Sequence, residues 1–185
     1  MKGRGEGGAG SVRRDPARST SEQTDSDPER PALALTAGDP SGIGPEIVLK
    51  ALADERSLAA RIIVLGDARN LRRTSRDLRL RWPFAGVLRQ PPRGRRWDRP
   101  VLLDLHDAGG ALVPGQVSAE GGRAAADAIE KGAELALSGV VDGIVTAPVH
   151  KEALSLAGVE DMTVNATAAM NAISRSAQST ASSSA

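Results

Sequence analysis

Short apolar runs alternate with helix-like segments through the middle of the chain. Leu33–Thr36 and Arg61–Leu65 each predict a buried strand, Val101–Leu105 predicts a third, and Val140–Thr146 predicts a fourth. The segments between them have the composition or spacing of helices. Because strands that alternate with helices are typical of parallel sheets, the pattern predicts an α/β fold.

Three shorter helices are expected around these strands. One follows the glycine- and proline-rich loop Gly38–Glu46, where Pro45 suits a first helical turn because it lacks an N–H group. A second is expected near Ala68–Ser75, with loops from there to Pro100. A third is expected over Glu152–Ala157, directly after the break that Pro148 introduces.

The clearest helix is predicted from Ala119 to Leu137. Its many alanines favour a helix and permit close packing. Ser118 is the candidate N-cap, and Ser138-Gly139 is the expected end. One face of this helix is predicted to carry Ala125, Ile129, Ala133 and Ala136.

The two ends of the chain differ in composition from the middle. Residues 1–30 contain almost no large apolar side chain, so we expect a disordered extension. Residues 31–160 form the predicted α/β part. Residues 161–185 are mostly Ser, Ala, Thr and Asn, and we expect a loosely ordered tail.

Composition excludes several classes of protein. The chain has no cysteine, so disulfides, thiolate catalysis and cysteine-based zinc sites are excluded. No apolar run approaches the roughly 20 residues of a membrane span, so no membrane partner is expected. The N-terminus lacks the apolar stretch of a secretory signal. A cytoplasmic location is therefore expected.

The formal net charge of +1 conceals a strongly basic stretch, Arg69–Arg99, with eleven arginines and only two aspartates. Such a stretch can bind nucleic acid electrostatically. Single-strand binders also use interleaved aromatic side chains for stacking, and aromatic residues make up only 2% of this chain. The composition favours a solvated arginine surface over a nucleic-acid partner.

Two segments could carry chemistry at strand ends. The loop Gly38–Glu46 can present backbone N–H groups to an anion, and Asp39 adds a carboxylate. It contains neither a dinucleotide-binding glycine pattern nor a P-loop, so a strand–helix turn without a ligand is the alternative. The second segment exposes the Thr146 hydroxyl, the His150 imidazole and the Lys151 ammonium. The alternative interpretation of this second segment is a solvated His-Lys pair at a loop.

Two other polar segments have structural interpretations. His106-Asp107 supplies too few ligands for a metal site and no nucleophile for a triad, so a surface position is expected. Gly115–Gly122 is glycine-rich and contains Ser118, and it is expected to lead into the long helix.

Three longer segments, taken together, resemble the 4-hydroxythreonine-4-phosphate dehydrogenase family of pyridoxal phosphate biosynthesis. They are Leu33–Ile47, Gly115–Ala125 and Val145–Leu154 followed by Ala157-Gly158, in the family's order. The resemblance covers roughly Pro31 to Gly158 and thins between Arg69 and Val113. Three long blocks in order are more specific than any short motif.

This resemblance implies a three-layer α/β/α fold of the isocitrate/isopropylmalate-dehydrogenase-like type, incomplete at the C-terminus, and a cytoplasmic homodimer. It implies NAD and a divalent metal (Zn, Mg or Co) as cofactors, and oxidation with decarboxylation of 4-phosphooxy-threonine in pyridoxal 5'-phosphate biosynthesis. Related family members act on threonate phosphate or on cis-dihydrodiols, so these substrates are alternatives. A third alternative is that the chain is a non-catalytic binding remnant with an α/β fold.

The resemblance also shows a departure. Family members carry Pro-Gly-His-Thr-Glu after the third block, whereas this chain has Met162–Ala166. We therefore expect a truncated chain that is inactive alone, and we hypothesise that its tail reflects a frameshift. We expect no metal ligand in this chain. Its catalytic and cofactor-binding residues are unknown. The candidates for lining the cleft are Asp39, Thr146, His150 and Lys151: Asp39 would order the loop, and Lys151 would supply positive charge.

Overall fold

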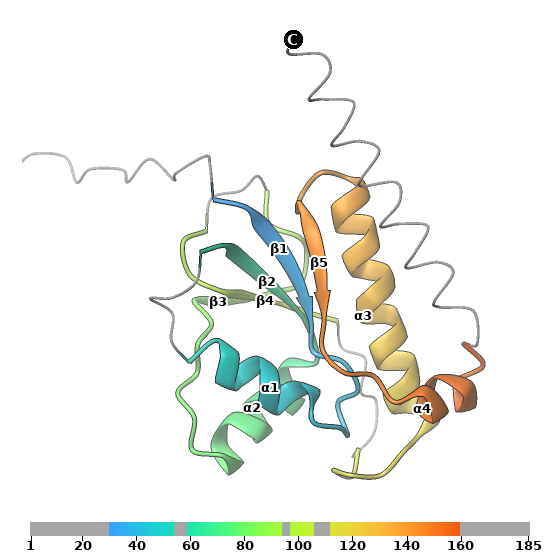
Figure 1. Ribbon diagram of the computed structural model, residues 1–185. Coiled ribbons are helices and arrows are strands. Elements are labelled where there is room, and N and C mark those ends of the chain that lie inside the picture. The colour runs from blue at the N-terminus through green and yellow to red at the C-terminus, as the bar shows by residue number, and fades with distance from the viewer. Residues whose placement is uncertain (1–29, 54–58, 94–96, 106–111, 160–185) are drawn as a thin grey trace, which may run out of the picture.

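The computed structural model describes residues 30–53, 59–93, 97–105 and 112–159. The described residues form one parallel sheet of five strands in the order β3-β4-β2-β1-β5 (Figure 1). The predicted α/β fold with a parallel sheet is confirmed. The strands are β1 (Ala32–Thr36), β2 (Arg61–Gly66), β3 (Gly86–Leu88), β4 (Val101–Asp104) and β5 (Gly143–Thr146).

Helices α1 (Gly44–Ala51) and α2 (Ala68–Asp77) cover one face of the sheet. Alternate residues of each central strand point to this face because side chains alternate along a strand. The resulting apolar cluster joins the two helices to β2 and β4, and its members include Val48, Leu49, Leu71, Ile62, Val64 and Leu102.

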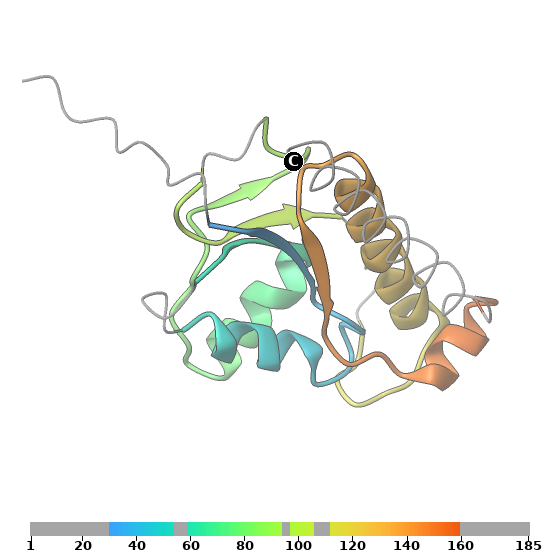
Figure 2. The same ribbon diagram turned by 45° about the horizontal axis from the view of Figure 1, so that its top comes forward.

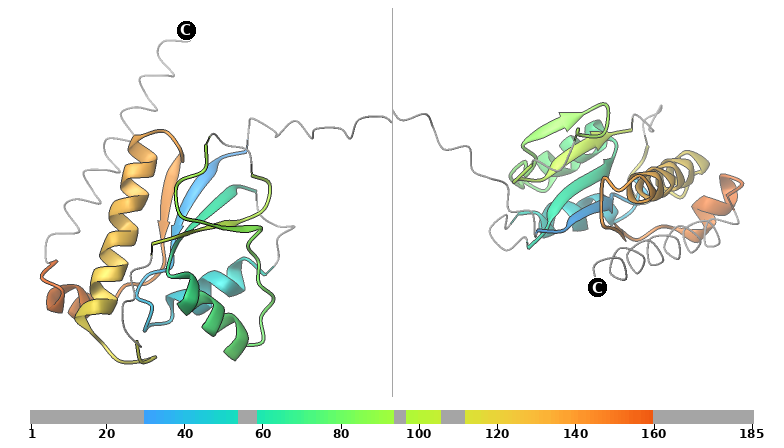
Figure 3. Two further views of the ribbon diagram at one scale, coloured as in Figure 1. Left: turned by 180° about the vertical axis from the view of Figure 1, so that it is seen from behind. Right: turned by 90° about the horizontal axis from the view of Figure 1, so that it is seen from above.

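Helices α3 (Ala119–Leu137) and α4 (Lys151–Leu156) complete the fold: α3 packs on the opposite face of the sheet, and α4 packs against α3. Figures 2 and 3 show the sheet between α3 and the α1–α2 pair, which confirms the three-layer arrangement. This second cluster contains Ala34, Ile63, Leu65, Leu103, Ala128 and Leu135. Small side chains on α3 bring the helix close to the strands.

The local signals at the ends of α3 are confirmed. The Ser118 hydroxyl accepts a hydrogen bond from the Gly121 N–H at 3.1 Å, which satisfies one of the free donors of the first turn. Gly139 follows the C-cap with a φ of +73°. The predicted apolar face is only partly right, because Ile129 and Ala133 are half-buried while Gly132 and Leu135 are fully buried.

Two strand predictions need correction. The expected loop up to Pro100 contains β3, which pairs with β4. This short edge strand is half-buried on every residue and lacks an apolar run to reveal it. Strand β5 begins at Gly143 rather than at Val140, because the N–H groups of Val140 and Val141 both donate to the Leu135 carbonyl at the end of α3.

Helix bounds differ by a few residues from the prediction. Helix α2 extends to Asp77, and α4 begins at Lys151. No helix among the described residues is long and apolar enough to cross a membrane. The predicted extension before Arg30, the tail 161–185 and His106-Asp107 lie outside the described residues. Arg30 itself donates a hydrogen bond to the Ala60 carbonyl at 3.2 Å.

Candidate functional site

The carboxyl ends of β1 and β5 lie side by side, since Thr36 pairs with Thr146 in the register of the sheet. The chain leaves them in opposite directions, from β1 to α1 on one face and from β5 to α4, which packs beside α3 on the other. Such a topological switch point is where open α/β sheets bind ligands. We call the loops that follow these two strands, with the first turn of α3, the β1–β5 junction.

The two loops of the β1–β5 junction touch through their backbones. Gly38 has a φ of +69°, and a β-carbon there would lie 2.5 Å from the Pro148 carbonyl oxygen. Both the left-handed conformation and the missing side chain therefore favour glycine at this position. A β-carbon on Gly44 would overlap the Ala37 carbonyl oxygen, so the start of α1 is also pressed against β1.

Asp39 is buried, with 4% of its surface exposed. Its Oδ1 accepts a hydrogen bond from the Ser41 N–H at 2.8 Å, and its carbonyl accepts one from the Gly42 N–H at 3.0 Å. The carboxylate therefore turns the chain toward α1, as aspartate does in tight turns. A β-carbon on Gly121 would lie 2.5 Å from the same Oδ1, which places the carboxylate directly against the first turn of α3.

Helices α3 and α4 approach each other through Gly122. A β-carbon at this position would overlap the Ala153 carbonyl oxygen, and Ala153 is itself fully buried. The segment that follows β5 is thereby fixed to the start of α3. The three segments that carry the family resemblance, far apart in sequence, thus meet at one end of the sheet.

Of the four predicted site residues, three are exposed and one is not. Thr146, His150 and Lys151 lie at the end of β5 and the start of α4 with exposed surfaces. Asp39 is at the same end of the sheet, but its carboxylate faces α3 and its own loop. The fold therefore places all four at the β1–β5 junction, with the hydroxyl, imidazole and ammonium accessible and the carboxylate enclosed.

Three buried polar atoms near these strand ends have no hydrogen-bond partner within the described part of the chain. They are Thr36 Oγ1 at the end of β1, Ser41 Oγ in its loop, and Asn70 Oδ1 on α2, whose Nδ2 donates to the Pro40 carbonyl at 2.8 Å. Buried polar atoms normally have partners, so this end of the sheet retains hydrogen-bonding capacity.

Sequence reasoning missed two aspartates at the other strand ends. Asp67 caps α2, accepting hydrogen bonds at Oδ1 from the Arg69 N–H at 2.6 Å and the Asn70 N–H at 3.0 Å. Asp104 accepts one from the Ala68 N–H at 3.1 Å and lies 3.5 Å from Arg89. Asp67 directly follows β2 and Asp104 is the last residue of β4, so a polar residue at the end of a short apolar run was the available signal. The carboxylates of Asp67 and Asp104 therefore have structural roles.

The described residues also bear on the ligands that a divalent metal would need. Within the described ranges, no group of three His, Asp or Glu side chains comes together as a metal site. His150 is exposed, and the other histidine of the chain, His106, lies outside those ranges. The described residues therefore do not fit a divalent metal by themselves.

A family model described as pyridoxal phosphate biosynthetic protein PdxA matches residues 58–180. The chain is 38% identical over 140 residues to D-threonate 4-phosphate dehydrogenase of Bordetella bronchiseptica, covering 72% of this chain and 39% of that protein. It is 44% identical over 126 residues to 4-hydroxythreonine-4-phosphate dehydrogenase of a Synechococcus species, covering 66% of this chain and 34% of that protein.

A crystal structure of 4-hydroxythreonine-4-phosphate dehydrogenase from Burkholderia phymatum has a similar fold, with a TM-score of 0.67 and 33% sequence identity. The similarity covers 75% of this chain and 44% of that one. The chain spans about 40% of the length of the curated relatives it matches.

Proposed function

This chain belongs to the PdxA family of pyridoxal phosphate biosynthetic proteins, and on that premise we propose that it supplies one part of a dehydrogenase acting on a phosphorylated hydroxy acid. The proposed substrate is 4-hydroxythreonine 4-phosphate, the substrate in the name of the Synechococcus relative. The proposed reaction transfers a hydride from the carbinol carbon to NAD while the hydroxyl loses its proton, and the keto acid then loses carbon dioxide.

The observation that carries this proposal is the meeting of three sequence segments at the β1–β5 junction. Gly38 contacts the loop after β5, Gly121 contacts Asp39, and Gly122 contacts the first turn of α4. Each contact leaves no room for a side chain, so the exposed residues after β5 are held in a fixed position relative to β1 and α3. A fixed arrangement of polar groups at a switch point is what a substrate site requires.

The proposed roles follow from chemistry and exposure. The Lys151 ammonium would attract the substrate phosphate, since a compact cation suits a phosphate. The Thr146 hydroxyl and the His150 imidazole would line the same site and can exchange hydrogen bonds with the substrate's polar groups. Asp39 is buried, so its proposed role is to hold the loop, not to touch the substrate.

NAD and a divalent metal are cofactors that the family implies. The described residues do not fit a divalent metal by themselves. NAD would supply the hydride acceptor. We propose that the residues needed for both lie in the part of the family fold that this chain does not span, so that the 185-residue chain alone has no turnover. A cytoplasmic homodimer is proposed for the complete enzyme.

D-threonate 4-phosphate is the second candidate substrate, since the Bordetella relative carries that name. Both candidates offer a phosphate and an oxidisable hydroxyl. The exposed residues of the β1–β5 junction suit either one, so the choice requires a direct comparison of the two substrates.

A chimera tests the proposal. Residues 31–159 of this chain would replace the equivalent segment of the Bordetella bronchiseptica enzyme, and formation of reduced nicotinamide would be followed with each substrate. Turnover by the chimera, absent from the 185-residue chain, is the expected result. A folded chimera without turnover on either substrate would refute the proposal that this segment can serve a dehydrogenase.

Variants of the chimera separate the site from the scaffold. Lys151→Gln should raise KM for the phosphorylated substrate by about tenfold, because a charge-assisted hydrogen bond is lost. Lys131→Gln is the matched control, since Lys131 pairs with Glu134 on α3 at 2.6 Å, away from the junction. Equal effects of the two substitutions would contradict a specific phosphate contact by Lys151.

A further inference from the structure

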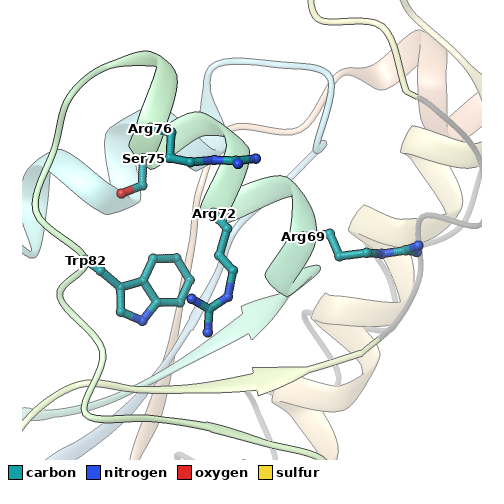
Figure 4. Close-up of a pocket in the computed structure, with 5 residues that line it drawn as sticks. All are labelled: Arg69, Arg72, Ser75, Arg76 and Trp82. Atoms are coloured by element: carbon teal, nitrogen blue, oxygen red, sulfur yellow. The ribbon is translucent and has the colours of Figure 1, made fainter.

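A pocket of about 430 Å³ lies beside α2, separate from the residues assigned to the β1–β5 junction (Figure 4). We propose that this pocket binds a small phosphate-bearing anion. The inference is independent of the proposed dehydrogenase function. The five described residues that line it are Arg69, Arg72, Ser75, Arg76 and Trp82, and we call it the arginine pocket.

None of the five residues that line the arginine pocket is acidic. Arg69, Arg72 and Arg76 are three and four residues apart on α2, so they lie on the same face of the helix. Arg69 lies 3.8 Å from the Asp67 carboxylate. Within the described part of the chain, Arg72 and Arg76 have no ion pair, so an anion in the pocket would relieve the repulsion among these like charges.

The Arg72 guanidinium is held in place by an aromatic side chain. Its central carbon lies 4.4 Å from the centre of the Trp82 ring, within the range of a cation–π contact. Trp82 in turn contacts the buried Phe84 edge-on, with ring centres 4.8 Å apart. A guanidinium positioned on a ring keeps its planar fork of donors ordered, which favours bidentate binding of a phosphate.

The loop that carries Trp82 is also fixed. The Ser75 hydroxyl donates a hydrogen bond to the Leu80 carbonyl at 2.9 Å, and the Leu80 N–H donates to the Ser75 carbonyl at 2.8 Å. These two bonds hold the chain as it turns from α2 toward Trp82. The turn that carries Trp82, and with it the Arg72 guanidinium, is therefore ordered before any ligand binds, which lowers the entropic cost of binding.

The size of the pocket favours a ligand larger than a single phosphate ion. Small-molecule sites typically have volumes of about 300–1,000 Å³, and the arginine pocket lies within that range. Two arginines that have no carboxylate partner among the described residues, and a third beside Asp67, match an anion of more than one charge. Pyrophosphate is therefore the probe of choice, and phosphate esters share the chemistry.

The test is isothermal titration of the complete 185-residue chain with pyrophosphate at constant ionic strength. Saturable binding at one site is expected, with about tenfold weaker affinity for Arg72→Gln and again for Arg76→Gln, since each removes hydrogen bonds to a charged group. Both side chains are exposed, so the variants should keep the far-UV circular dichroism of the parent. Absence of saturable binding by the folded parent chain would overturn the proposal.

Two further variants distinguish a binding site of defined geometry from general charge attraction. Arg72→Lys keeps the charge but loses the planar fork, and it should bind pyrophosphate several-fold more weakly. Arg81→Gln removes the same charge from an exposed residue that does not line the pocket, and it should bind within about twofold of the parent, because exposed charges are screened at physiological salt. Equal losses for Arg81→Gln and Arg72→Gln would contradict the proposal.

A single-stranded oligonucleotide serves as the competing ligand. If it bound more tightly than pyrophosphate, with a steep dependence on salt, the surface would be a nucleic-acid surface and the small-anion proposal would be wrong. If pyrophosphate bound and the oligonucleotide did not displace it, the proposal would stand.

Discussion

The β1–β5 junction and the arginine pocket position their polar groups by opposite means. At the junction, glycines let backbones touch, and the candidate side chains are placed by how closely the segments pack. At the pocket, long arginine side chains on one helix surround an open volume, and an aromatic ring orders one of them. Substitutions of the packed glycines at the junction should therefore affect folding, whereas substitutions of the arginines at the pocket should affect ligand binding.

The largest effect is expected for Gly122→Ala. The added β-carbon would overlap the Ala153 carbonyl oxygen, and a backbone atom cannot move aside cheaply. Overpacking of this kind should lower the free energy of unfolding by about 3 kcal/mol, even though alanine is the better helix former. Urea denaturation measures the change. Gly86→Ala is the control, because no atom of the described residues lies within 4 Å of a β-carbon there, and it should change stability by less than about 0.5 kcal/mol.

A double substitution tests whether the Asp39 carboxylate lies against the first turn of α3. Gly121→Ala alone should cost about 2 kcal/mol, because its β-carbon would lie 2.5 Å from the Asp39 carboxylate. In an Asp39→Ala background the carboxylate is gone, so the same substitution should cost about 0.5 kcal/mol or less. A double-mutant cycle by urea denaturation gives the coupling energy. Additive effects would mean that the carboxylate does not lie against α3 in solution.

A smaller loss is expected for Ser118→Ala, which removes the hydrogen bond that caps α3. Loss of an N-cap hydroxyl costs about 1 kcal/mol. Ser118→Asp retains an acceptor and should restore most of the stability, and both are measured by thermal unfolding followed by circular dichroism. If neither variant differed from the parent, the 3.1 Å contact to Gly121 would not stabilise the helix.

The smallest effect on stability is expected at the arginine pocket. Arg72→Gln removes an exposed cation–π contact, so the free energy of unfolding should fall by about 0.5 kcal/mol. Stabilities of the parent and the variant are compared in urea without any phosphate present. A loss as large as that of Gly122→Ala would remove the contrast between the two regions, because the arginine would then act as a structural residue.

Local patterns were sufficient for much of the fold. The apolar runs located β1, β2 and β4, and Ser118, Ser138 and Gly139 located both ends of α3. These features depend on residues close in sequence: a cap needs a side-chain acceptor within three residues, and a buried strand needs a continuous apolar run. The positions of the four candidate residues at the ends of β1 and β5 also followed from the sequence, because their segments follow strands, and their role in a site stays a prediction.

Other features depended on contacts between distant residues. Strand β3 forms only because Gly86–Leu88 lies along β4, and β5 starts late because α3 engages Val140 and Val141. The burial of Asp39 could not be inferred from its loop, since the wall against it is Gly121 on α3. The sequence predicted a solvated arginine surface, and Arg72 and Arg76 are exposed, but the contact of Trp82 with Arg72 could not be inferred from it.

The sequence by itself determined the alternation of strands and helices, the caps of α3 and the three segments that resemble the family. Only the tertiary structure decided that these segments meet at the β1–β5 junction and that three arginines and a tryptophan line one open pocket. The physical reason is that periodicity and capping are set by near neighbours. The order β3-β4-β2-β1-β5 and the contacts it creates are set by packing both faces of one sheet at once.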